Sequence, residues 1–234
     1  MGLADLHVHT IYSYDGTASV PAVLSRAKQI GLDVIAITDH DEIEGALKAF
    51  ELSLAYGVEV IPGIEITTAE GDLLALNITQ KIERGLSLIE TVLKVGEAGG
   101  FCIAPHPMAS GIGMKSLSAY SILKALRNID VARTLIAIET YNTTTIDRMS
   151  NHYAHILADR LDIAQTGSSD AHVAEAIGLG ATQFEGQTAQ DLIKALDRGN
   201  VRIHKSKEWN SVRILGSWAA NYFGSAFTRL ANAA

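Results

Sequence analysis

The segment Ile35-Ala36-Ile37-Thr38-Asp39-His40-Asp41 decides how this chain folds, because an apolar run ends abruptly in three ionisable residues. A short apolar run of this kind predicts a buried strand. In barrel folds, catalytic side chains gather at the carboxyl ends of the strands. The segment therefore predicts a barrel strand with His40 as a functional residue at its end. Capping of the next helix is the ordinary alternative for an aspartate here, and for Asp41 we favour it.

The same alternation of short apolar runs and helical periodicity extends along the chain and predicts repeated βα units with a mostly parallel sheet. The expected strands are residues 3–6, 33–38, 59–66, 73–78, 101–104, 135–140, 163–167 and 201–203. The expected helices, which have apolar residues three and four apart, are residues 20–30, 43–55, 86–98, 117–127, 146–159 and 189–198.

Other strand ends also hold histidines and carboxylates. In Asp5-Leu6-His7-Val8-His9-Thr10 the two imidazoles leave one face of a strand, because side-chain direction repeats every two residues. Glu65 interrupts an apolar strand, where a lone buried carboxylate is costly unless it is paired or bound to a metal. His106 follows the strand at 101–104, and Asp170 and His172 follow the strand at 163–167.

Each of these features has an ordinary structural role when it is taken alone. A histidine pair can be a polar strand edge, Asp15 can be a turn residue, and Asp170 can cap a helix. Five successive strand ends with such residues do not fit these separate roles and require a common partner. Imidazole and carboxylate ligands together suit Zn, Mn or Fe(II). The single cysteine, Cys102, lies in an apolar run and is expected to be a buried structural thiol.

Four motifs in this order resemble those of the polymerase and histidinol phosphatase (PHP) family: His7-Val8-His9, Thr38-Asp39-His40, Gly63-Ile64-Glu65 and Ser169-Asp170-Ala171-His172. The resemblance covers about residues 3–203, and residues 177–182 and 191–199 resemble the closing strand and helix of stand-alone members. It implies an α/β fold, a distorted (β/α)7 TIM-like barrel that binds two or three divalent metal ions.

The resemblance also implies a ligand set. His7, His9, Glu65 and Asp170 would hold one ion, and Asp15, His40 and His172 would hold another. Glu65 would bridge to a third ion that His106 also binds. The family usually supplies one more histidine to this ion, and Asp72 stands at the matching position. Glu139 matches a polar position beside the site, outside the ligand set.

The implied activity is hydrolysis of phosphate esters by a metal-activated hydroxide, and the residues expected to take part in catalysis are Asp39, His40, Glu65 and Asp170. Asp39 is expected to orient a ligand histidine, with proton relay as the alternative. We favour a nucleoside bisphosphate, a short oligonucleotide or another small phosphomonoester as the substrate. The alternatives are a histidinol phosphatase, an amidohydrolase-type metal hydrolase and a non-catalytic relative that binds a phosphorylated ligand.

The remaining features concern partners and location. The formal net charge of −7 argues against a surface that grips duplex nucleic acid. The chain starts without a secretory leader pattern and has no run of about 20 apolar residues, so we expect a cytoplasmic protein without a membrane span.

The expected domains are a phosphoesterase domain, residues 1–208, and a helical extension, residues 209–234. Apolar residues at helical spacing, Leu215, Trp218, Tyr222, Phe223, Phe227 and Leu230, predict an amphipathic C-terminal helix. We expect this helix to pack on its own barrel, and a homodimer contact is the alternative.

Overall fold

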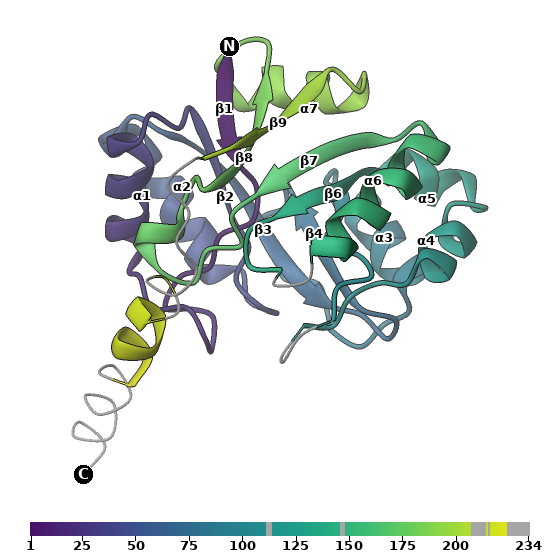
Figure 1. The fold of residues 1–234 in the computed structure, drawn as a ribbon, viewed down its shortest axis with the longest axis horizontal. Coiled ribbons are helices and arrows are strands. Elements are labelled where there is room, and N and C mark those ends of the chain that lie inside the picture. Colours follow the sequence, from purple (N-terminus) through teal and green to yellow (C-terminus); the bar gives the residue numbers. More distant parts are fainter. Residues whose placement is uncertain (111–113, 146–147, 207–213, 215, 224–234) are drawn as a thin grey trace.

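The computed structural model describes residues 1–110, 114–145, 148–206, 214 and 216–223 (Figure 1). Within them, one sheet of nine strands is surrounded by helices. The strands are β1 (Gly2–Asp5), β2 (Val34–Ile37), β3 (Glu59–Thr67), β4 (Asp72–Leu76), β5 (Phe101–Ala104), β6 (Leu135–Asn142), β7 (Ala164–Ser168), β8 (Gly180–Phe184) and β9 (Val201–Lys205). The helices are α1 (Val20–Gln29), α2 (Glu44–Tyr56), α3 (Leu88–Glu97), α4 (Ala119–Ala125), α5 (Ile129–Thr134), α6 (Arg148–Leu161) and α7 (Ala189–Asp197), with one 3-10 turn, Ala174–Ala176.

The sheet curls into a nearly closed barrel with the strand order β7-β6-β5-β4-β3-β2-β1-β8-β9. Strands β1, β2 and β3 pair in parallel, and so do β5, β6 and β7. The pairs of β4 with β3 and β5, and of β8 with β1 and β9, are antiparallel. The expected α/β barrel is therefore confirmed, with antiparallel strands inserted among the parallel ones.

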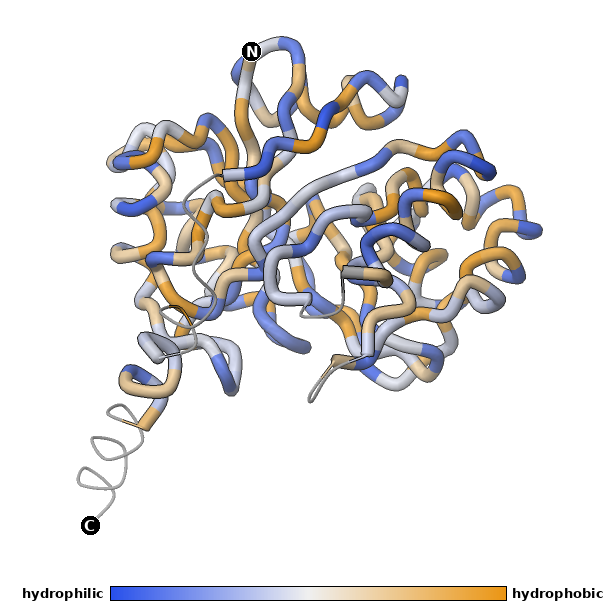
Figure 2. Tube along the Cα trace, in the orientation of Figure 1, coloured by the Kyte–Doolittle hydropathy of each residue, from blue (hydrophilic) through white to orange (hydrophobic). Residues whose placement is uncertain are grey.

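Two apolar clusters hold the barrel together. One fills its interior with alternate strand residues, such as Val34 and Ala36 of β2, and includes Leu192 and Leu196 of α7. The other lies between the sheet and the outer helices. In Figure 2, α1 alternates between hydrophobic and hydrophilic segments, as expected for a helix with one face on this second cluster.

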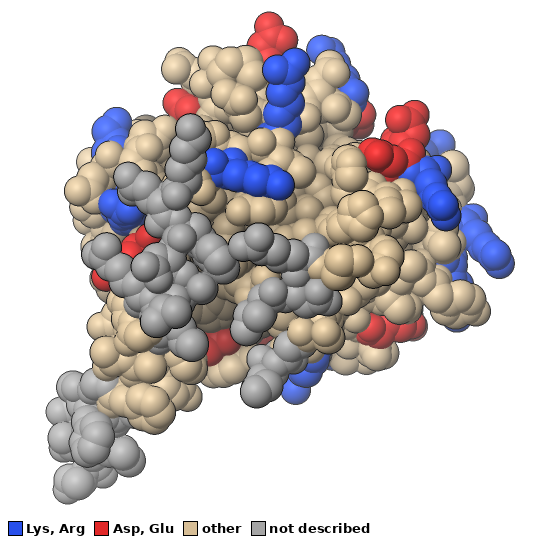
Figure 3. Space-filling model, in the orientation of Figure 1, with Lys and Arg blue, Asp and Glu red and all other residues tan. Residues whose placement is uncertain are grey.

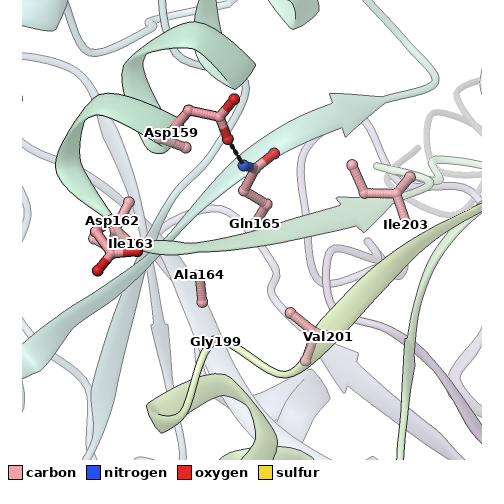
Figure 4. Close-up of a pocket in the computed structure, with 9 residues that line it drawn as sticks. Asp159, Asp162, Ile163, Ala164, Gln165, Gly199, Val201 and Ile203 are labelled. Atoms are coloured by element: carbon pink, nitrogen blue, oxygen red, sulfur yellow. Dashed lines mark hydrogen bonds between the residues drawn. The ribbon is translucent and has the colours of Figure 1, made fainter.

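The barrel closes where β7 meets β9, and these two strands form the edges of the hydrogen-bonded sheet. The Thr182 hydroxyl of β8 links to the backbone of Gly167 in β7. At the amino-terminal ends of β7 and β9 lies a pocket of about 390 Å³, where Gln165 donates a hydrogen bond to Asp159 (Figure 4). This pocket lies at the end of the barrel opposite to the strand ends that bear the histidines.

All eight expected strands and all six expected helices are present, with boundaries shifted by a few residues. Strand β8 was indicated by the family resemblance alone, and helix α5 was not expected. The capping role favoured for Asp41 is wrong. The residue before α2 is Ile43, without a side-chain cap, and the Asp41 carboxylate instead accepts a hydrogen bond from the backbone N–H of Thr67.

The expected C-terminal helix is present over residues 216–223. Ile214 and Trp218 pack against the apolar cluster of the same barrel, as expected. The expected domain boundary at 208/209 and the stripe residues Leu215, Phe227 and Leu230 lie outside the described residues. Among the described helices, none is long and apolar enough to cross a membrane.

Candidate metal centre

The strand ends bring the predicted ligands together at one end of the barrel. His7 and His9 follow β1, and between them Val8 forms a bridge with Ala171 after β7. A second bridge joins His40 after β2 to Glu65 within β3. Because parallel strands end at the same rim, residues more than 160 positions apart in sequence become neighbours. His106 and Asp170 have positive φ angles of 27° and 52°, a conformation that is uncommon for residues with side chains.

Four of these residues surround one small volume: His7, His9, Glu65 and Asp170. His7 Nε2 lies 3.2 Å from Glu65 Oε2 and 3.4 Å from Asp170 Oδ1. His9 Nε2 lies 3.3 Å and 3.2 Å from the same two oxygens. Ligand atoms about 2.0 to 2.2 Å from a tetrahedral zinc ion are roughly 3.4 Å apart, so these four atoms have the separation that one shared ion requires.

Several candidate ligand atoms, in this volume and beside it, have no hydrogen-bond partner. Buried atoms without a hydrogen-bond partner include His7 Nε2, His9 Nε2 and Glu65 Oε2, and also Asp15 Oδ1 and Asp72 Oδ1. A buried polar atom normally has a partner, because leaving it without one costs about 1 to 3 kcal/mol. Five such atoms on predicted ligands fit divalent cations as the missing partners.

A second cluster lies nearer the surface and consists of His9, Asp15, His40 and His172. Asp15 Oδ2 lies 3.1 Å from His172 Nε2 and 3.5 Å from His40 Nε2. The His9 and His172 rings are stacked with their centroids 4.2 Å apart. The side chains of Asp15, His40 and His172 are 13% to 21% exposed, so this cluster opens to solvent.

A third cluster consists of His7, Glu65 and His106. Glu65 lies between His106 on one side and the other candidate histidines on the other. Glu65 Oε1 lies 3.1 Å from His106 Nε2, while its Oε2 faces His7, His9 and His40. Asp72 is not a member of the clusters that the described residues form. Its Oδ2 accepts a hydrogen bond from the backbone N–H of Lys115, and its Oδ1 has no partner.

Three residues that the sequence analysis did not predict, Asn142, Thr144 and Ser13, contact the candidate ligands or the residues next to them. The Asn142 amide donates to Glu139 Oε2 and to Asp170 Oδ2, and the Thr144 hydroxyl donates to the same Asp170 oxygen. The Ser13 hydroxyl oxygen accepts from the backbone N–H of His40 and lies 3.0 Å from His9 Nδ1. Uncharged polar residues of this kind are common in every loop, so the sequence offered no signal for them.

Asp39 lies behind the ligands. Its carboxylate accepts hydrogen bonds from the backbone N–H and the hydroxyl of Thr10, at 2.6 Å and 2.8 Å, and also interacts with Ser13. Because Ser13 contacts His9 and His40, it links the Asp39 carboxylate to these two ligand histidines. Burial raises the pKa of Asp39. Glu139, in contrast, contacts His7 directly, with 3.3 Å between Oε1 and Nδ1.

Opposite charges lie close together in these clusters and shift the pKa values of their members. Burial by itself would lower the pKa of His7, but the charges of Asp170, Glu65 and Glu139 raise it well above its usual value. Burial would raise the pKa of Glu65, and the neighbouring histidines lower it well below its usual range. Burial and the proximity of His172 lower the pKa of His9 to about 4. Metal ligation needs neutral imidazoles and ionised carboxylates, so the lowered pKa values of His9 and Glu65 favour it and the raised pKa of His7 opposes it.

Comparison with known proteins agrees with the geometry. The family model described as the PHP domain matches residues 5–200. An uncharacterized protein of Methanocaldococcus jannaschii is 36% identical over 161 residues, which are 64% of this chain and 88% of that protein. A 5'-3' exoribonuclease of Haemophilus influenzae is 32% identical over 133 residues, which are 55% of this chain and 47% of the exoribonuclease.

A similar fold occurs in the crystal structure of a two-domain protein from Bacteroides vulgatus that contains a predicted PHP-like metal-dependent phosphoesterase. The TM-score is 0.70 and the sequence identity is 18%, and the similarity covers 87% of this chain and 64% of the Bacteroides chain. With the family model matched over most of its length and the candidate ligands gathered at one barrel rim, this chain belongs to the PHP domain family.

Proposed function

We propose that this protein is a metal-dependent phosphoesterase that hydrolyses a phosphate ester of a small nucleotide, either a nucleoside bisphosphate or a short oligonucleotide. The observation that carries the proposal is the convergence of buried ligand atoms of His7, His9, Glu65 and Asp170 on one volume, with 3.2 to 3.4 Å between the imidazole nitrogens and the carboxylate oxygens. Three of these atoms, in His7, His9 and Glu65, have no hydrogen-bond partner, whereas buried polar atoms normally have one. Their arrangement supports divalent cations as the common partner, with Zn, Mn and Fe as the candidates.

The ligand residues have separate tasks. When bound, divalent ions lower the pKa of a water molecule and neutralise charge on phosphoryl oxygens. Glu65, with one oxygen on each side, would hold two ions at a fixed separation. The cluster of His9, Asp15, His40 and His172 would hold the ion nearest the solvent, because these side chains are the more exposed ones. The substrate phosphate would therefore enter on the side of His40 and His172.

An exposed aromatic ring at this entrance favours a nucleotide substrate. Tyr14 is 63% exposed, and its ring stacks on the His40 ring with 5.0 Å between centroids. An exposed aromatic ring next to a phosphate site can stack on a nucleobase, an interaction worth about 1 to 3 kcal/mol per base. The similarity to an exoribonuclease supports the same substrate class.

The charge distribution on one face of the molecule argues against binding of duplex nucleic acid to that face. On the face shown in Figure 3, lysines and arginines alternate with acidic side chains, and no continuous basic track crosses the described part of that face. Duplex binding depends on neutralising many phosphates, which such a distribution does not provide.

Metal analysis of the purified protein together with a phosphate-release screen tests the proposal. The screen would contain nucleoside bisphosphates, short oligonucleotides, sugar phosphates and histidinol phosphate. We expect bound transition metal and turnover of a nucleotide substrate. The variants His40→Ala and Asp170→Ala are expected to lose metal and activity together while they keep the circular dichroism spectrum of the folded protein. Full turnover by either variant would contradict the role given to that residue.

The nucleotide part of the proposal has its own test. The variant Tyr14→Ala is expected to raise KM for a nucleoside bisphosphate by about 5- to 160-fold, which corresponds to the stacking energy, with a smaller change for p-nitrophenyl phosphate. Tyr120→Ala is the matched control, because Tyr120 is 74% exposed on α4. An equal change for both substrates would contradict a stacking role, and preferred turnover of histidinol phosphate would identify the alternative substrate class.

A further inference from the structure

The C-terminal helix, residues 216–223, contacts the loop that holds Asp15. The indole N–H of Trp218 donates a 3.0 Å hydrogen bond to the backbone carbonyl of Asp15, 203 residues earlier in the chain. Trp218 packs against the apolar cluster of the barrel and stacks on Tyr222. Figure 1 shows this helix, in yellow, beside the purple loop that follows β1, at the end of the barrel toward which β1 runs. The match to the family model ends at residue 200, so the contact comes from a part of the chain beyond it.

Asp15 is the member of its cluster with the least support from secondary structure. His40 pairs with Glu65 of β3 in a β-bridge, and His9 and His172 each follow a residue of the bridge between Val8 and Ala171. Asp15 lies in an irregular loop. Hydrogen bonds close this loop at its base, between Ile11 and Ala18 and between Thr17 and His172. The bond from Trp218 acts on the Asp15 backbone itself, between these two anchor points.

We propose that Trp218 is a positioning residue for Asp15, and that the C-terminal helix thereby sets the affinity of the metal site formed by His9, Asp15, His40 and His172. This inference rests on the metal site of the proposed function. A carboxylate on an irregular loop loses conformational freedom when it binds an ion, and this loss weakens binding. The indole bond fixes the loop beforehand, with Asp15 Oδ2 already 3.1 Å from His172 Nε2. The extension therefore belongs to the metal centre as a support for one ligand.

Titration of the metal-free full chain with Mn²⁺ alone, followed by calorimetry and by electron paramagnetic resonance, tests the inference. Trp218→Phe keeps a large ring and removes the N–H donor. We expect it to weaken one Mn²⁺ site by roughly 2- to 12-fold, the loss expected for one hydrogen bond, and to leave the other sites unchanged. Phe223→Leu is the matched control in the same helix, because Phe223 is 62% exposed, and it should bind Mn²⁺ like the wild type. Unchanged Mn²⁺ affinity in Trp218→Phe would overturn the inference.

A double-mutant cycle separates positioning of Asp15 from a general loss of structure. Asp15→Asn removes the ligand charge but keeps the backbone carbonyl, so Trp218→Phe should have no further effect on Mn²⁺ binding in this background. An equal loss in both backgrounds would contradict the inference. The titration contains no substrate, so a wrong substrate class leaves this test intact. A wild-type protein without any Mn²⁺ site would overturn both this inference and the proposed function.

Discussion

Oε1 of Glu139 lies 3.3 Å from Nδ1 of His7, on the side of the imidazole that faces away from Glu65 and Asp170. The other oxygen of Glu139 accepts hydrogen bonds from the backbone N–H of His106, at 2.7 Å, and from the Asn142 amide, at 2.8 Å. One buried carboxylate of β6 therefore supports two candidate ligands from different strands. An acceptor at Nδ1 places the proton there and leaves Nε2 free to bind a metal ion.

Glu139→Gln tests this support. The substitution keeps the size of the side chain but removes the charge that orients His7. We expect metal affinity to fall by about 10- to 100-fold, the loss that is common when a carboxylate behind a ligand histidine is changed. Competition with a chelator of known affinity would measure it. Glu185→Gln, an exposed substitution, is the control, and equal affinity in the two variants would contradict the role of Glu139.

Asp72→Asn tests whether Asp72 completes a third metal site. Asp72 is buried, one of its oxygens has no partner, and burial together with the charge of Glu65 raises its pKa to about 6. We expect the variant to bind one metal ion fewer per chain, as measured by elemental analysis, because an amide is a poorer ligand than a carboxylate. The metal-free variant should be at least as stable as the wild type, because a buried charge is removed. Unchanged metal content would exclude Asp72 from the ligand set.

Asp5 predicts a pH dependence of stability. Its carboxylate is fully buried beneath the site and accepts hydrogen bonds from the backbone N–H groups of Ser169 and Gly178. Burial raises its pKa from 3.8 to about 6. The folded state therefore binds this proton more tightly than the unfolded state, so the contribution of Asp5 to stability is greatest below pH 4 and is lost as the pH rises through 6.

Urea unfolding of the metal-free protein between pH 4 and pH 7 measures this effect. Relative to Asp5→Asn, the wild type should lose roughly 2 to 3 kcal/mol of unfolding free energy across this range. The comparison with the variant cancels the opposite contributions of Glu65 and Asp170, whose pKa values are lowered. A constant difference between the two proteins would contradict a raised pKa for Asp5.

The sequence predicted the barrel well because its strands are short, apolar and regularly spaced. Strand β2 is buried at all four positions, and an apolar run that ends in Asp39 and His40 is typical of a strand that leads into a functional site. Strand β8 does not stand out as an apolar run because Thr182 and Gln183 interrupt it, and α5 has only six residues, which is too short for a periodic pattern. Antiparallel pairing of β4 leaves no mark on its composition, because this strand is buried at every position.

For the candidate site, the sequence predicted the ionisable residues but not the uncharged residues that support them. Histidines and carboxylates at strand ends are rare enough to be noticed, so His7, His9 and Glu65 stood out. Asn142 and Ser13 did not, because their roles depend on contacts across the barrel that no local pattern encodes. The contact of Trp218 with Asp15 spans almost the whole chain and could be found only in the fold.

The central claim is that His7, His9, Glu65 and Asp170 share a cation. Anomalous diffraction from crystals grown with Mn²⁺ tests it most directly. We predict an anomalous peak within bonding distance of all four side chains, with a further peak among Asp15, His40 and His172. A map without a peak among the first four residues would contradict this claim. This holds both when Mn²⁺ fully occupies other sites and when no Mn²⁺ is bound.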